Sequence, residues 1–159
     1  MLIEDTKIRF AHLSDAQFIA ALSKEHIEYD LRWRYTPKKI KNIIKNNTKN
    51  IVVSKTDGNL SGFGVMTYHE EQANLDLLAI LPQYRRKSIG TQIEKWLEKV
   101  ALIAGIYNIF VQVREQNTDA IKFYESLGYV IIDKKEKYYN KIESGLMMSK
   151  ILRKMFNAT

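Results

Sequence analysis

A short polar loop between two apolar stretches holds the first group of residues whose types and spacing can do chemistry. Arg85, Arg86 and Lys87 follow the apolar run Leu77–Leu81, and Gly90 stands where an amphipathic stretch begins. The start of a helix offers unpaired backbone N–H groups and the positive end of the helix dipole. We therefore interpret this loop as a site for a diphosphate group, to which the hydroxyls of Ser88 and Thr91 could add donors. The alternative is a solvated basic turn ahead of an ordinary helix.

Two common nucleotide-binding motifs are absent from this loop. A Walker A loop needs a Gly-Lys-Ser/Thr sequence at a set distance from an earlier glycine, and this sequence has none. The glycines of the Rossmann fingerprint are missing as well. If the loop binds a diphosphate, it belongs to a different class of site.

A second informative stretch runs from Asn117 to Tyr129 and reads Asn-x-x-Ala-x-x-Phe-Tyr-Glu-x-x-Gly-Tyr. With the Arg-x-x-Ser-x-Gly loop of residues 85–90 before it, the chain resembles the GNAT superfamily of N-acetyltransferases. The two patterns occur in the family's order, with one expected helix and one expected strand between them. The resemblance extends over nearly the whole chain.

The resemblance implies a role for each matching position. The strand before the loop would bind the pantetheine arm of acetyl-CoA through the backbone of Leu78, Ala79 and Ile80. The loop would bind the diphosphate through residues Arg85, Arg86, Lys87, Ser88, Ile89, Gly90 and Thr91. Asn117 would contact the cofactor, and Tyr124 would return a proton to the leaving thiolate. Without the resemblance, Tyr124 would be a core residue and Asn117 only a helix cap.

The chemistry that the resemblance implies is direct attack of an amine on the thioester. A backbone N–H can stabilise the negative charge that develops on the carbonyl oxygen. A phenol with a pKa of about 10 can protonate a thiolate whose reference pKa is about 8.5. The sequence has no cysteine, which agrees with a reaction that needs no covalent enzyme intermediate.

Two positions depart from the family's pattern. Ser88 replaces the first glycine of the loop, and we expect it to adopt ordinary loop dihedrals and to preserve binding. Gln112 stands where members that acetylate protein N-termini often have a glutamate base. A glutamine cannot accept a proton at neutral pH, which counts against a ribosomal-protein N-terminal acetylase.

An alkylammonium acceptor must lose a proton before it attacks, and Asp76 is the base that we favour. In Leu75-Asp76-Leu77 the alternation could direct this carboxylate toward an acceptor cleft. Glu70, Glu71 and His69 are the other candidates. The two glutamates lie near a predicted hairpin and suit an exposed turn, whereas His69 suits the end of a strand.

The acceptor itself is left open by the sequence. The segment 28–35 would lie on the acceptor side, and it mixes two acids, two arginines and three aromatic residues. Aromatics with acids suit a cationic amine, whereas arginines suit a carboxylate or phosphate. A simpler interpretation is an interhelical loop pinned by Trp33 and Tyr35.

The elements that would position these residues follow from hydrophobic periodicity and helix-end signals. We expect an α/β mixed sheet with helices on both faces, in the order β-α-α-β-β-β-α-β-α-β-β. Ser14 and Gln17 suggest a capping box for a first helix over 15–29, and Thr36-Pro37 begins a second. The expected strands are 8–10, 51–54, 62–68, 75–81, 109–113, 129–132 and 146–152, and the later helices are 89–104 and 117–127.

Composition limits the class of protein. The 159 residues predict one domain, with a core over about 7–152 and a short basic tail in which we include Lys150. The sequence shows no transmembrane helix, no signal peptide and no cysteine-based metal site, so we expect a cytoplasmic enzyme without metal.

Two other functions stay open, the first of them because of the net charge of +7. One is a nucleic-acid-binding module, which lacks any recognised motif and is the less favoured. The other is a catalytically weak acyl-CoA sensor of the same fold, supported by Ser88 and Gln112. Members of the family are often homodimers, and the apolar strand 146–152 could pair across such an interface.

Overall fold

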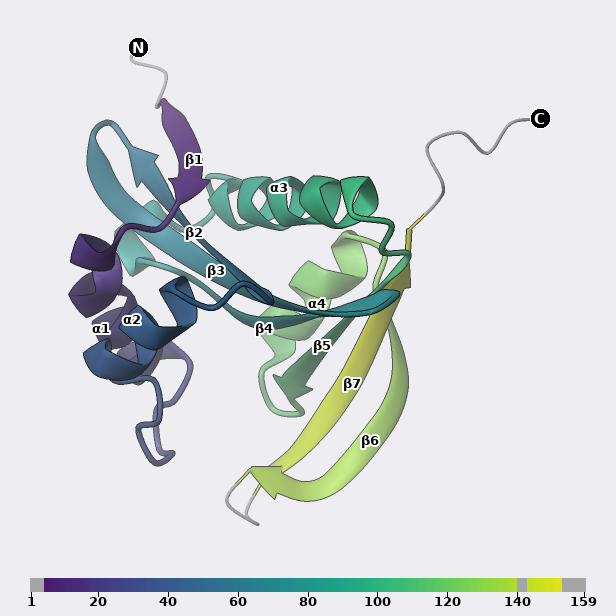
Figure 1. The fold of residues 1–159 in the computed structure, drawn as a ribbon. Helices are drawn as coiled ribbons and strands as arrows, with labels where there is room; N and C mark the ends of the chain where they lie inside the picture. The colour runs from purple at the N-terminus through teal and green to yellow at the C-terminus, as the bar shows by residue number, and fades with distance from the viewer. Residues whose placement is uncertain (1–4, 140–142, 153–159) are drawn as a thin grey trace. The chain divides into compact units, whose positions relative to one another are not determined.

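The computed structural model describes residues 5–139 and 143–152. Contacts divide the chain into two compact units, which comprise residues 1–67 with 77–97 and residues 68–76 with 98–159. We call them the first and the second unit. Strands β3 and β4 and helix α3 each contribute residues to both (Figure 1).

The predicted order of elements is confirmed, with two short 3₁₀ helices added. The elements are β1 (Thr6–Phe10), η1 (Leu13–Asp15), α1 (Ala16–His26), α2 (Pro37–Ile44), β2 (Lys49–Thr56), β3 (Asn59–His69), β4 (Gln72–Ile80), η2 (Pro82–Tyr84), α3 (Ile89–Ile103), β5 (Asn108–Arg114), α4 (Thr118–Ser126), β6 (Val130–Tyr139) and β7 (Glu143–Ile151). The strand order is β1-β2-β3-β4-β5-β7-β6. The fold is thus the predicted α/β type with a mixed sheet.

In the first unit, β1, β2 and β3 form an antiparallel meander. The turn between β2 and β3 is an Asp-Gly hairpin turn, with positive φ angles of 50° at Asp57 and 86° at Gly58. Helices α1 and α2 cover one face of these strands through a shared apolar cluster that includes Ile19, Ile40 and Phe63, all fully buried.

The N-terminal part of α3 covers the opposite face of the same strands (Figure 1). Gly64 of β3 makes this close approach possible. A Cβ atom built there would lie 2.8 Å from Cγ2 of Ile93 and 3.1 Å from Cδ1 of Leu97. The helices therefore lie on both faces of the sheet within this unit, as predicted.

The start of α1 differs from the prediction. Ser14 does not form a capping box with Gln17. The capping box lies in the preceding η1 and joins its N-cap His12 to Asp15, and Asp15 is in turn the N-cap of α1. The Asp15 carboxylate accepts hydrogen bonds from the His12 N–H at 2.7 Å and from Arg9 Nη1 at 2.8 Å. The local pattern could not reveal this because Arg9 belongs to the preceding strand. Helix α1 also ends at His26, before the predicted Tyr29.

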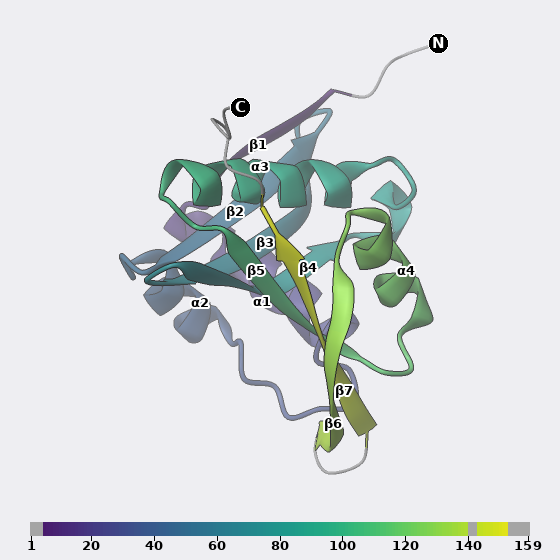
Figure 2. The ribbon, with the colours of Figure 1, turned by 90° about the vertical axis from the view of Figure 1, so that its right-hand side faces the viewer.

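In the second unit, β4 pairs with β5 in parallel from Gln72–Asn108 to Leu75–Val111. Strand β7 then lies between β5 and β6 and is antiparallel to both (Figure 2). The predicted apolar strand 146–152 thus has a neighbouring strand on each side. This leaves β7 no free edge for pairing across a dimer interface, and the homodimer itself stays a prediction.

Helix α4 and strand β7 complete the second unit. Asn117 caps α4 by accepting a hydrogen bond from the Ala120 N–H at 3.1 Å, as predicted. Lys150 is not part of a solvated tail, because it lies in β7 and its ammonium contacts the Glu98 carboxylate at 2.9 Å. Arg153 and Lys154, the other tail cations, lie outside the described residues.

Candidate active site

The polar loop predicted from the sequence lies in the first unit, between β4 and α3. Pro82 ends the strand and begins η2, and the chain then turns back on itself. The N–H of Leu81 donates to the Ser61 carbonyl at 2.8 Å, and that of Tyr84 donates to the Leu81 carbonyl at 2.9 Å. These bonds fix the chain at the point where it leaves the sheet.

The backbone of this loop is in the left-handed region at two residues that are not glycine. Arg86 has φ = 62° and Ser88 has φ = 61°. The expectation that Ser88 adopts ordinary loop dihedrals is therefore wrong. A glycine would take this conformation without steric cost, whereas a serine pays of order 1–2 kcal/mol for the crowding of its Cβ.

Helix α3 begins directly after Ser88, and its first backbone N–H groups have no hydrogen-bond acceptor within the helix. Among the described residues, the first bond of this helix runs from the Gln92 N–H to the Ser88 carbonyl at 3.0 Å. The N–H groups of Ile89, Gly90 and Thr91 precede it and have no carbonyl one turn earlier in the helix. Ile89 is buried and anchors the helix start, while the residues before it are exposed.

The Arg85 side chain has a structural role that the sequence did not indicate. Its Nε donates to the Ile80 carbonyl at 3.1 Å, and its Nη2 lies 3.3 Å from Nδ1 of His26. The guanidinium thus connects the loop to the end of β4 and to the end of α1. No local pattern predicted this contact, because Arg85 and His26 are 59 residues apart in the sequence.

The end of β4 is held closely against β3. Ala79 is buried, and Leu78 and Ile80 are half-buried. At Gly62 of β3 a Cβ atom would lie 2.5 Å from Cδ1 of Ile80 and 2.8 Å from the Ala79 carbonyl oxygen. The backbone that the resemblance assigns to pantetheine is therefore rigidly supported within the first unit.

Asn117 and Tyr124 lie in the second unit. Tyr124 is 6% exposed, and its ring packs edge-on against Phe123 at 5.1 Å and against Tyr129 at 5.4 Å. Packing on two sides holds the ring in one orientation, as a positioned proton donor requires. The cap uses the Oδ1 atom of Asn117, so the Nδ2 donors of this side chain take no part in that bond.

The candidate bases also lie in the second unit. Asp76 is exposed between buried Leu75 and Leu77, which confirms the predicted alternation. Glu70 has φ = 45° in the turn between β3 and β4, and Glu71 beside it is exposed. These glutamates are thus turn residues.

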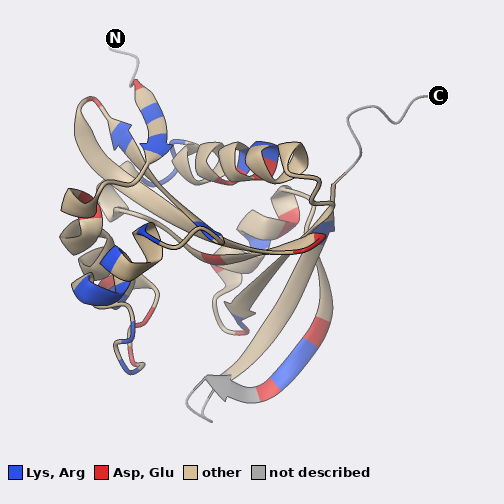
Figure 3. Cartoon of the chain, viewed as in Figure 1, with Lys and Arg blue, Asp and Glu red and all other residues tan. Residues whose placement is uncertain are grey.

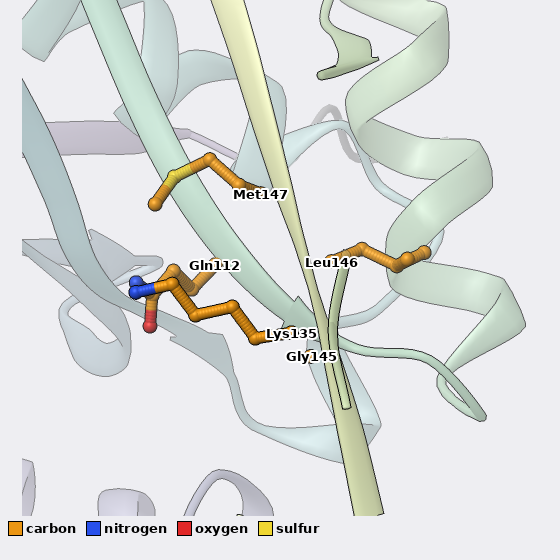
Figure 4. Close-up of a pocket in the computed structure, with 5 residues that line it drawn as sticks. All are labelled: Gln112, Lys135, Gly145, Leu146 and Met147. Carbon is orange, nitrogen blue, oxygen red and sulfur yellow. The ribbon is translucent and has the colours of Figure 1, made fainter. Parts of the chain in front are cut away.

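Gln112 lines a shallow pocket on the surface of β5, β7 and β6 (Figure 4). It lies opposite Met147 in the β5–β7 register, and Lys135 of β6 completes the wall beside it. Figure 4 labels Gln112 and Lys135 among the residues that line this pocket. The position at which the family resemblance led us to look for a glutamate base thus carries a neutral side chain, and Lys135 lines the same pocket.

The segment between α1 and α2 is organised by a buried acid. Glu28 is 4% exposed, and its carboxylate accepts hydrogen bonds from Ser23 Oγ at 2.9 Å and from the Arg34 N–H at 2.7 Å. Trp33 packs against the apolar cluster, with the Lys24 ammonium 4.7 Å from its ring centroid. The Glu28 carboxylate therefore stabilises this segment and is not available to bind the acceptor amine.

Residues 9–129 match the Acetyltransferase (GNAT) family, and the chain belongs to this family. The match begins in β1 and ends at Tyr129, so it contains both the loop and the Asn117–Tyr129 motif. The resemblance noted in the sequence is confirmed.

Relatives of this chain include acetyltransferases of two kinds. The catalytic subunit NAA20 of the N-terminal acetyltransferase B complex of Arabidopsis thaliana is 38% identical over 76 residues, which are 47% of this chain and 44% of that protein. The chain thus spans less than half of the length of this relative. Spermidine N(1)-acetyltransferase of Thermoplasma acidophilum is 29% identical over 115 residues, 70% of this chain and 71% of that protein.

A solved structure shares the fold over nearly all of the chain. The PaiA N-acetyltransferase of Thermoplasma acidophilum in complex with coenzyme A has a TM-score of 0.79 and is 24% identical, covering 92% of this chain and 99% of its own. Within the described part of the present structure, no group of three or more acidic, histidine or cysteine side chains could hold a metal ion. No helix in the same residues is long and apolar enough to cross a membrane.

Proposed function

We propose that this protein is an N-acetyltransferase that uses acetyl-CoA and acetylates a primary amine by direct attack. The observation that carries the proposal is the loop 85–91, where cations, two left-handed residues and the first amides of α3 come together. Such an arrangement of backbone N–H groups is a site for an anion such as a diphosphate. Membership of the GNAT family supports acetyl-CoA as its source.

The residues that would hold the co-substrate follow from this assignment. Backbone groups of Leu78, Ala79 and Ile80 would hold the pantetheine arm. The diphosphate would be held by the loop, chiefly by the amides from Ser88 to Thr91 and by the charges of Arg86 and Lys87. Asn117 would contribute a side-chain donor. Acetyl-CoA supplies an activated acyl group. The protein has to bind and orient this co-substrate and to protonate the thiolate that leaves.

Two side chains would handle the protons. Tyr124, fixed between two aromatic rings, would protonate the thiolate that leaves. Asp76, exposed on β4, would accept the proton of the incoming ammonium, directly or through water. No metal is required for either step.

The acceptor is a primary amine on a small molecule or on a protein. Relatives named for an N-terminal acetyltransferase complex and for spermidine support both kinds.

Calorimetric titration with desulfo-CoA tests the co-substrate site without turnover. We expect binding in the micromolar range for the wild type and a loss of at least about tenfold in Gly90→Asp, since a carboxylate would then repel phosphate at the helix start. Gly58→Asp, in the exposed turn between β2 and β3, is the matched control and should bind normally. Equal affinity of both variants would place the diphosphate elsewhere.

Turnover separates an enzyme from a sensor of the same fold. Thiol release from acetyl-CoA with a panel of amines should reveal an acceptor, and Tyr124→Phe should lower kcat by about 10²-fold while desulfo-CoA binding is retained. If no amine supports thiol release although desulfo-CoA binds, the sensor is the better interpretation.

We further propose a cytoplasmic location, which the lack of cysteine supports. A homodimer is also compatible with the family, but it would not form by pairing along an edge of β7, because both edges are already paired. Light scattering of the purified chain with and without desulfo-CoA measures its oligomeric state.

A further inference from the structure

Arg85 forms a bridge between three segments of the first unit. Its guanidinium donates to the Ile80 carbonyl at the end of β4 and contacts Nδ1 of His26, the last residue of α1. Its own N–H donates to the Pro82 carbonyl at 3.2 Å, which closes the 3₁₀ turn. Both the side chain and the amide of Arg85 are thus committed to the protein itself.

The chemistry of this contact requires one form of the histidine. A guanidinium has only donors, so Nδ1 must offer a lone pair, and the imidazole must be neutral with its proton on Nε2. The Glu25 carboxylate lies 3.8 Å from Nε2, on the far side of the ring from Arg85. A second proton would remove the lone pair and place two cations against each other.

We propose that His26 is a positioning residue of the diphosphate loop, which acts by holding the Arg85 guanidinium against the end of β4. The proposal rests on the function proposed above. In this arrangement Arg85 organises the loop, and the charges that meet the phosphates come from Arg86 and Lys87. The last turn of α1 thereby becomes part of the support of the co-substrate site, although no sequence motif includes it.

Titration with desulfo-CoA at about pH 8 tests the role directly. We expect His26→Ala to weaken binding by about 3- to 10-fold, the range of one hydrogen bond. His26→Asn should restore affinity to within about twofold, because the Asn Oδ1 can take the place of Nδ1 as an acceptor. Gln17→Ala, on the exposed side of the same helix, controls for the change in helix composition.

A double-mutant cycle distinguishes a positioning role from general loss of stability. His26→Ala should have little further effect on affinity in an Arg85→Ala background, because the interaction is then already lost. If the two substitutions are additive, or if His26→Ala binds as tightly as the wild type, the proposal is wrong.

Amide hydrogen exchange, measured without ligand, tests the Arg85–His26 contact independently of the proposed function. Exchange at residues 81–88 should be faster in His26→Ala than in the wild type and in Gln17→Ala. If the wild type binds no desulfo-CoA, the proposed function fails, and faster exchange still supports the Arg85–His26 contact. Unchanged exchange overturns the contact whether or not the ligand binds.

Discussion

Ser88 occupies a backbone conformation that suits glycine, in a loop that the family usually builds with glycine. Because its φ angle is 61°, we expect Ser88→Gly to raise the free energy of unfolding by about 0.5–1 kcal/mol, the relief of strain less the entropy gained by the unfolded chain. Chemical denaturation measures this. Lys87→Gly, at a neighbouring position without positive φ, should instead lower stability. A stabilised Lys87→Gly would mean that the loop gains from flexibility alone.

Asp15 should make stability depend on pH. Burial raises the pKa of its carboxyl, but the hydrogen bond from Arg9, the His12 N–H and the charge of Arg9 together outweigh burial and lower the pKa below its usual value. The stabilisation is therefore present above the pKa of the unfolded chain, about 3.9, and is lost as pH falls through the lower folded value.

The corresponding substitution is Asp15→Asn. It should cost about 1–3 kcal/mol at pH 7, since hydrogen bonds to a buried charge are broken. In urea titrations at several pH values this difference should begin to shrink below about pH 3.9, the pKa of the unfolded carboxyl, and should disappear as pH falls through the lower folded value. Asp30→Asn removes an exposed carboxylate and should change stability by less than about 0.5 kcal/mol. A difference independent of pH would point to packing instead of charge.

At the scale of elements, the distance between α3 and the sheet is set by Gly64, which has no side chain. Gly64→Ala would place a methyl group 2.8 Å from Ile93 Cγ2, and both residues are buried. We expect a loss of about 1–3 kcal/mol from overpacking, measured by thermal or chemical unfolding.

A compensating substitution tests the cause of this loss. Ile93→Ala removes the opposing atoms, so it should cost clearly less in the Gly64→Ala background than in the wild type. Because α3 also begins at the diphosphate loop, Gly64→Ala should weaken desulfo-CoA binding as well. Additive costs of the two substitutions would show that the helix moves without strain.

Charged side chains on β6 form a local network in the second unit. Lys134 contacts Glu115 at 3.0 Å and Glu136 at 3.6 Å, and the run of acid, base and acid is visible along the strand (Figure 3). The neighbouring carboxylates raise the pKa of Lys134. Because this lysine is exposed, the network contributes little to stability, and it shows that part of the basic charge is already matched within the chain.

For the whole molecule, binding of the co-substrate should raise the free energy of unfolding. Desulfo-CoA at about 100 times its Kd should stabilise the chain by about 2.7 kcal/mol, because it binds the folded state alone. Differential scanning calorimetry should show a higher Tm with desulfo-CoA and a smaller increase with pantetheine, which lacks the diphosphate. Equal shifts with both ligands would mean that loop 85–91 contributes nothing.

The sequence by itself determined the type and order of the elements, because these depend on signals a few residues apart. The Thr36-Pro37 start of α2 agrees with the local prediction, and so do the helices expected over 89–104 and 117–127. Each of these two helices is followed by a glycine with positive φ, Gly105 and Gly128. The two family patterns are local in the same sense. They identified the family, and the match over residues 9–129 confirmed it.

The tertiary structure alone decided which partners these side chains have. Arg85 meets His26 across 59 positions, and Lys150 meets Glu98 across 52, distances over which no periodicity carries information. The left-handed backbone of Ser88 also depends on how β4 and α3 fix the two ends of the loop, since the residue type by itself favours ordinary dihedrals. Local chemistry thus specified what the site contains, and long-range packing specified which of its charges are directed to the protein itself.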